Sequence, residues 1–150
     1  MRYAGPVRQE LRVRTIFNLL GPLTNPASAQ RQLIGVFAPE WQQPIAEVAQ
    51  LLGSTHVMVV HANGLDELSI SGTSTIVELK DAEIQRYTIE PEDFGIATQR
   101  VEDLHANSPE SSLELVRRSL SGDDPSGAAD IVALNAGAAI YVAGIADTLA

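Results

Sequence analysis

The chain has 150 residues, of which 45% are hydrophobic, and a formal net charge of −9. This composition is enough for one domain with its own core and excludes a low-complexity chain. The acidic balance argues against a nucleic-acid partner, because surfaces that bind phosphate backbones cluster Lys and Arg. The absence of cysteine excludes disulfides and thiolate metal sites. No apolar run reaches the roughly 18 residues that cross a bilayer, and no secretory signal is evident at the N-terminus, so we expect a cytoplasmic protein.

The segment 14–27, RTIFNLLGPLTNPA, is apolar but repeatedly interrupted. An asparagine, a Gly-Pro pair and an Asn-Pro pair break it at intervals that neither a regular helix nor a regular strand tolerates. One interpretation is a buried loop that forms the wall of a site. The alternative is a helix that ends at Leu20, with Gly21 in the left-handed cap position and Pro22 as the stop.

The pattern around this segment alternates helices and strands. We expect a helix over 6–20 and a strand over 32–37. Apolar residues three and four apart predict a helix over 39–52, with Pro44 in its first turn. The run HVMVVH at 56–61 is typical of a strand buried on both faces of a sheet. The order is therefore β-α-β.

The second half of the chain adds a hairpin and two helices. Strands over 75–79 and 84–89 are joined by a short turn and predict an antiparallel hairpin. Helices are expected over 108–121, which begins with a capping Ser-Pro-Glu, and over 128–149, which is rich in alanine and closely packed. We therefore predict an α/β fold, a mixed and mainly parallel sheet flanked by helices, in a single domain over 1–150.

An acidic pair, Asp66 and Glu67, follows the buried strand and a turn at Asn63-Gly64. Open α/β sheets bind their ligands at this end of a strand. Mg²⁺ suits such a pair, because it takes one or two carboxylates and completes its coordination shell with water and substrate phosphates. On the residues alone, an ordinary solvated acidic pair is the alternative.

Half of the ten Lys and Arg residues lie in the first 31 positions. A small anionic ligand would explain this asymmetry, and the alternative is a solvated helix face, since Arg8 and Arg12 are one turn apart.

Three segments of the chain together resemble the anthranilate phosphoribosyltransferase family. They are the interrupted apolar segment 14–27, the stretch PVRQEL at 6–11 and the string GLDE at 64–67. The resemblance implies the catalytic fold of nucleoside phosphorylases and phosphoribosyltransferases, and an enzyme of tryptophan biosynthesis. That enzyme transfers the phosphoribosyl group of phosphoribosyl pyrophosphate to anthranilate, releasing pyrophosphate.

Residue by residue, the resemblance implies that Arg8 contacts anthranilate and that Gly21 and Pro22 line the same pocket. It implies that Asp66 and Glu67 bind Mg²⁺, with two ions that share Glu67. It assigns no catalytic acid or base, because the aromatic amine is itself nucleophilic. It gives no role to Arg12, where many members have glycine, and none to His61, which we expect to be structural.

The resemblance covers only the C-terminal part of such an enzyme. The family's glycine-rich GTGGD loop for the pyrophosphate and its KHGN segment are absent from the 150 residues. Family members are usually homodimers through an N-terminal helical domain, which is also missing here. We therefore expect the isolated chain to be inactive. A pyrimidine nucleoside phosphorylase-like enzyme, or a non-catalytic binding module on the same fold, are the alternatives.

Overall fold

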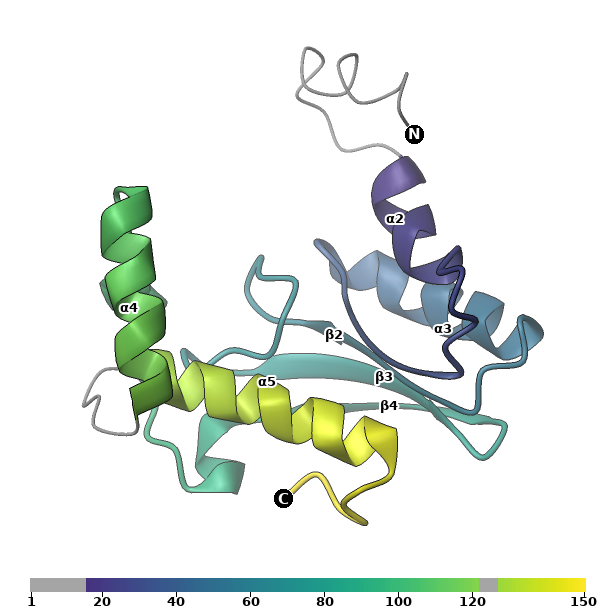
Figure 1. Ribbon diagram of the computed structural model, residues 1–150. Coiled ribbons are helices and arrows are strands. Elements are labelled where there is room, and N and C mark those ends of the chain that lie inside the picture. The colour runs from purple at the N-terminus through teal and green to yellow at the C-terminus, as the bar shows by residue number, and fades with distance from the viewer. Residues whose placement is uncertain (1–15, 122–126) are drawn as a thin grey trace, which may run out of the picture.

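The computed structural model describes residues 16–121 and 127–150 (Figure 1). Arg8, Arg12 and most of the helix predicted over 6–20 lie outside these ranges. In the described part of the chain no helix is long and apolar enough to span a membrane. The helices are α2 (Ile16–Leu23), α3 (Gln42–Leu51), α4 (Pro109–Ser121) and α5 (Gly127–Ala143), with short 3-10 turns η1 (Pro39–Trp41), η2 (Pro91–Phe94) and η3 (Val101–Leu104).

Four strands form one mixed sheet in the order β1-β2-β3-β4. They are β1 (Arg31–Gly35), β2 (His56–His61), β3 (Ser74–Lys80) and β4 (Glu83–Ile89). The predicted mixed sheet and hairpin are confirmed, but the expectation of a mainly parallel sheet is wrong for the described residues. Only β1 and β2 run parallel, and β3 is antiparallel to both of its neighbours. The reason is that no helix lies between β2 and β3, whereas a parallel return needs a long crossover.

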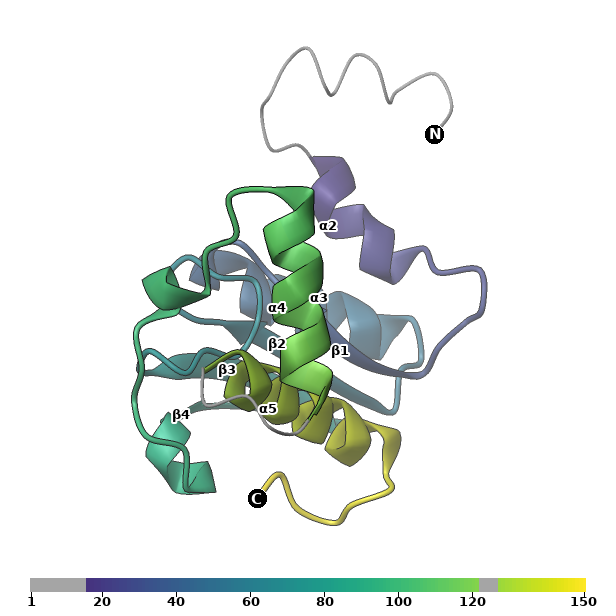
Figure 2. The ribbon, with the colours of Figure 1, turned by 60° about the vertical axis from the view of Figure 1, so that its left-hand side comes forward.

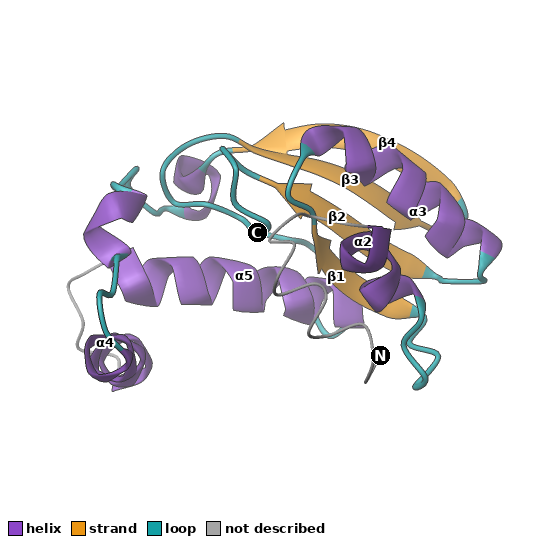
Figure 3. Cartoon of the chain, turned by 90° about the horizontal axis from the view of Figure 1, so that it is seen from above, coloured by secondary structure: helices purple, strands orange, loops and turns teal. Residues whose placement is uncertain are grey.

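Helices cover the sheet on both faces (Figure 3). Because side chains alternate along a strand, Val57 and Val59 of β2 join the core on the α2–α3 side, whereas Met58 and Val60 join the core under α5. All four are essentially inaccessible to solvent. The prediction that this strand is buried on both faces is confirmed.

Helix α2 settles the interpretation of the interrupted apolar segment. Residues 16–23 are helical, so the buried loop is wrong there. The helical alternative is closer, but Gly21 is not left-handed and the helix continues through Pro22 to Leu23. The Thr24 N–H donates to the Leu20 carbonyl in a last helical hydrogen bond, and the Thr24 hydroxyl donates to the same carbonyl. Pro22 has no N–H to donate to the carbonyl four residues earlier, so the helix loses one hydrogen bond there and continues for only one more residue.

Helix α5 is shorter than predicted, because it ends at Ala143 rather than running to 149. Gly144 has a φ of 77°, and its N–H donates to the Tyr141 carbonyl. The next N–H, of Ile145, donates to the Ile140 carbonyl. This is the usual glycine-terminated end of a helix.

Helix α4 packs against α5 (Figure 2), and the view from above shows that it stands away from the sheet (Figure 3). None of its residues is buried, and its predicted apolar stripe is exposed at Leu113, Val116 and Leu120.

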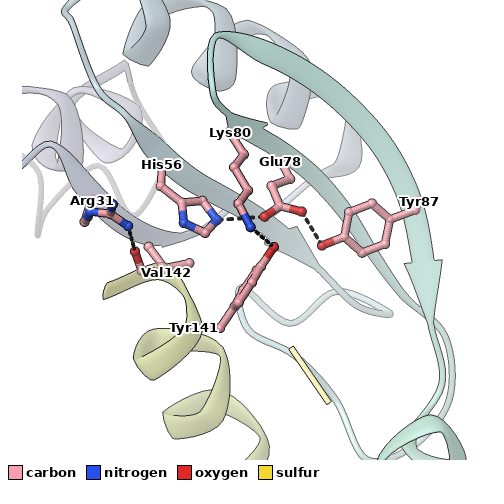
Figure 4. A network of polar contacts seen from close by, with 7 residues as sticks. All are labelled: Arg31, His56, Glu78, Lys80, Tyr87, Tyr141 and Val142. Carbon is pink, nitrogen blue, oxygen red and sulfur yellow. Dashed lines mark hydrogen bonds and ion pairs between the residues drawn. The ribbon is translucent and has the colours of Figure 1, made fainter. Parts of the chain in front are cut away.

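A polar network at the amino end of β2 joins the sheet to α5 (Figure 4). The Glu78 carboxylate lies 2.7 Å from His56 Nε2 and accepts a 2.7 Å hydrogen bond from the Tyr87 hydroxyl. Tyr141 of α5 meets the His56 ring edge to face and accepts a hydrogen bond from Lys80. Burial, followed by the hydrogen bond to Glu78, raises the pKa of Tyr87, so this hydroxyl remains protonated.

Tyr87→Phe is expected to lower the free energy of unfolding by about 1–3 kcal/mol, because it leaves one oxygen of the buried Glu78 carboxylate without its donor. Tyr141→Phe is the matched control, since the same atom is removed but the partner Lys80 is exposed. That variant should lose less than about 1 kcal/mol. Urea denaturation followed by circular dichroism compares the two, and equal losses would contradict the importance assigned to Glu78.

Candidate functional site

The acidic pair is presented by a tight turn that follows β2. Ala62 and Leu65 exchange two backbone hydrogen bonds, of 3.1 and 2.7 Å, around Asn63 and Gly64. Both central residues have positive φ, 44° and 86°, which is the backbone of the turn that Asn-Gly favours. The predicted turn is therefore confirmed, and it directs the chain back across the carboxyl end of β2.

The returning chain lies against the carboxyl end of β1. A Cβ atom added at Gly35 would be 1.5 Å from the Asp66 carbonyl oxygen, so glycine alone allows this approach. Because β1 and β2 are parallel, their carboxyl ends meet at this edge of the sheet. The structure thus places the acidic pair at the edge where α/β sheets bind ligands.

Both carboxylates are exposed, although Leu68, the next residue, is fully buried. Among the described residues neither Asp66 nor Glu67 has an ion pair or a side-chain hydrogen bond. Partial burial of the carboxyl, followed by the charge of the neighbouring Asp66, raises the pKa of Glu67. A cation bound between the two groups would relieve that repulsion.

This donor set fits Mg²⁺ and does not fit a metal held entirely by protein. The described residues contain no group of three or more His, Asp or Glu side chains placed to hold an ion. Two exposed carboxylates at an open edge match Mg²⁺, which keeps several waters and binds substrate phosphates as well.

Two hollows lie close to the acidic pair in the chain, one lined by Leu65 and the other by Glu67. One, of about 540 Å³, lies between the Asn63 turn, Ser71 and the segment 98–105, and Arg100 brings a positive charge to its wall. The other, of about 270 Å³, has Glu67 at its border and is otherwise mostly apolar, with walls from η3, α4 and α5. The first is in the size range of small-molecule sites.

Of the remaining predicted residues, Gly21 and Pro22 are not brought to this edge. Arg8 lies outside the described residues. Gly21 is exposed, and Pro22 borders a cavity of about 210 Å³ together with Gln30, before the start of β1. The acidic pair is at the other end of β1, and four strand steps span about 13 Å. His61 contributes structure, since its Nδ1 donates to the Val36 carbonyl at 2.8 Å.

The whole chain, residues 1–150, matches the family described as "Glycosyl transferase family, a/b domain". The chain belongs to this glycosyl transferase family. It is 57% identical over 152 residues to the anthranilate phosphoribosyltransferase of Marinomonas sp. (strain MWYL1), and the match covers all of the chain and 44% of that protein. The resemblance seen in the sequence is thereby confirmed.

Solved structures of relatives share the fold. The anthranilate phosphoribosyltransferase of Thermus thermophilus superposes with a TM-score of 0.85 at 45% identity, covering 99% of this chain and 44% of that one. The Saccharomyces cerevisiae enzyme in complex with PRPP and Mg gives 0.80 at 26% identity, covering 96% and 42%. The yeast enzyme has also been solved with 4-fluoroanthranilate, with a TM-score of 0.81, 26% identity and coverage of 95% and 42%. The chain spans less than half the length of these relatives.

Two residues at the site were not predicted from the sequence. Nothing in the sequence marks Gly35 as part of the site, because a single glycine at the end of a strand has many explanations. Asn135 of α5, whose side chain reaches the backbone of Leu68, carried a weak signal, since a polar amide stands out in an alanine-rich helix.

Proposed function

We propose that this chain is the metal-binding part of an anthranilate phosphoribosyltransferase, which joins anthranilate to phosphoribosyl pyrophosphate and releases pyrophosphate. The observation that carries the proposal is the Asp66–Glu67 pair at the carboxyl edge of parallel strands β1 and β2, where neither carboxylate has an ion-pair partner among the described residues. The 57% identity to the Marinomonas enzyme supports anthranilate as the acceptor. The yeast relative that was solved with PRPP and Mg supports the donor and the ion.

Asp66 and Glu67 would hold Mg²⁺ at this edge, with Glu67 shared if two ions bind. Mg²⁺ bound there would stabilise negative charge on the departing pyrophosphate. The turn at Asn63-Gly64 and the close approach at Gly35 fix where the two carboxylates stand. Preorganised charge of this kind is the main catalytic contribution that these residues can make.

The anthranilate side of the reaction is assigned by resemblance. A guanidinium at Arg8 would hold the carboxylate of anthranilate through two parallel hydrogen bonds, and Gly21 and Pro22 would line the same pocket. The anthranilate amine then attacks the anomeric carbon as the bond to pyrophosphate breaks, with inversion at that carbon. The amine afterwards loses its proton to solvent, so no side-chain base is assigned.

The test is a chimera in which the 150 residues replace the matching segment of the Marinomonas enzyme. Because this chain and the Marinomonas enzyme are 57% identical, the inserted residues should pack against the rest of that enzyme. The chimera should consume anthranilate and release pyrophosphate in a reaction that requires phosphoribosyl pyrophosphate and Mg²⁺. The 150-residue chain alone should show no measurable transfer.

Two outcomes would contradict the proposal. A folded chimera that cleaves pyrimidine nucleosides with phosphate and ignores anthranilate would indicate a nucleoside phosphorylase. A folded chimera that binds anthranilate and Mg²⁺-pyrophosphate in calorimetry without turnover would indicate a non-catalytic binding module.

A further inference from the structure

The side chain of Asn135 bridges α5 to the chain directly after the acidic pair. Its Oδ1 accepts a 3.0 Å hydrogen bond from the Leu68 N–H, and its Nδ2 donates to the Leu68 carbonyl at 2.9 Å. Nδ2 also donates to the Ile131 carbonyl one turn earlier in the helix, at 3.0 Å. The amide thus pairs with both backbone groups of Leu68, as a neighbouring strand would.

Leu68 needs this pairing because its side chain is fully buried. Backbone groups that are drawn away from water must find partners inside the protein. Asparagine suits the position, since its short side chain carries a donor and an acceptor side by side. An isosteric leucine could satisfy neither group.

The bridge also fixes the peptide plane of the acidic pair. The Glu67 carbonyl and the Leu68 N–H belong to one planar peptide unit. Holding the Leu68 N–H therefore fixes the orientation of that plane, and it restricts the directions in which the Glu67 side chain can leave the backbone.

The helix that carries Asn135 is itself firmly held. At its far end Arg31 donates to the Val142 carbonyl at 2.9 Å, and Tyr141 packs on His56 (Figure 4). At its near end Gly127 packs so closely on Ile70 that an added Cβ would lie 2.5 Å from the Ile70 Cδ1 atom. The backbone of α5 therefore holds the Asn135 side-chain amide in a fixed position.

We infer that Asn135 is a positioning residue, which holds the Glu67–Leu68 peptide so that the Asp66 and Glu67 carboxylates stand ready for a divalent cation. The inference rests on the metal role in the proposed function. Residues that orient metal ligands typically change metal affinity by about 10–100-fold when they are replaced.

The experiment measures Mn²⁺ binding to the full chain by electron paramagnetic resonance, with inorganic pyrophosphate present, together with hydrogen exchange at the Leu68 amide. The variants are Asn135→Leu and Asn135→Ser, so that one remains informative if the other does not fold. Val142→Ala is the control, because it creates a cavity in the same helix but leaves the acidic pair untouched. Asp66→Asn removes a proposed ligand.

Both Asn135 variants should weaken Mn²⁺ binding by about 10–100-fold and speed exchange at Leu68, whereas Val142→Ala should change neither. If Asp66→Asn abolishes binding while the folded Asn135 variants bind like wild type, the positioning role is wrong and the metal site stands. If wild type and Asp66→Asn bind Mn²⁺ alike, the metal site is wrong and the positioning role fails with it.

Discussion

Asp66→Asn and Glu67→Gln are each expected to reduce phosphoribosyl transfer by the chimeric enzyme more than the roughly 10–100-fold that changes around a metal site cause. Each substitution keeps the size of the side chain and removes one negative charge. Both carboxylates are exposed and have no ion-pair partner among the described residues, so neither substitution breaks an ion pair within that part of the chain. The variants should therefore retain the wild-type stability while the Mg²⁺ concentration for half-maximal rate rises.

Glu47→Gln is the matched control for this pair. Glu47 is an exposed carboxylate on α3 that accepts a hydrogen bond from Gln43 of the same helix. Its neutralisation changes the net charge by the same amount and should leave the rate and the Mg²⁺ requirement unchanged. If the Glu67→Gln enzyme kept the wild-type rate and the wild-type Mg²⁺ dependence, the proposed role of Glu67 as a metal ligand would be wrong.

The residues that the sequence placed well are those whose local chemistry decides their structure. The unbroken apolar run of β2 predicts burial on both faces, and its bounds agree with the structure. Asn63 and Gly64 predict a tight turn, because few other pairs tolerate two successive positive φ values. Together these two features were enough to put the carboxylates at the exit of the strand.

Elsewhere tertiary contacts outweighed the local pattern. Gly21 and Pro22 normally end a helix, yet α2 continues to Leu23, where Leu19 and Leu23 pack on the core one turn apart. Burial of an apolar face can offset a weak turn in this way. The direction of β3 is set by the connection after β2, which contains no crossover helix, and not by the composition of either strand.

The support of the site could not be predicted, since it joins residues far apart in the sequence. Asn135 reaches Leu68 across 67 positions, and Gly35 meets Asp66 through backbone atoms alone. A single sequence does not show which residues that are far apart along the chain come into contact. The chemistry of the pair was therefore visible in the sequence, and the means of holding it in place was visible only in the structure.

Gly35→Ala is expected to be the most destabilising single substitution near the site. The new Cβ would lie 1.5 Å from the Asp66 carbonyl oxygen and 2.5 Å from the carbonyl carbon. No flexible side chain can yield there, and the loop is held by the Ala62–Leu65 turn before Asp66 and by the Asn135 bridge after it. Overpacking typically costs about 1–3 kcal/mol, and a contact with backbone should reach the upper end of that range.

Gly137→Ala separates this steric effect from the general cost of replacing glycine. Gly137 lies within α5, its φ is not positive, and an added Cβ would meet no atom within 4 Å. The free energy of unfolding of that variant should rise by up to about 1 kcal/mol, because alanine has a higher helix propensity than glycine. Gly35→Ala should instead lower the urea midpoint by about 1 M or more, given a slope of about 1–3 kcal/mol per molar urea. A Gly35→Ala chain with an unchanged midpoint would show that the loop can move away from β1, and the acidic pair would then lack the fixed position on which its catalytic role depends.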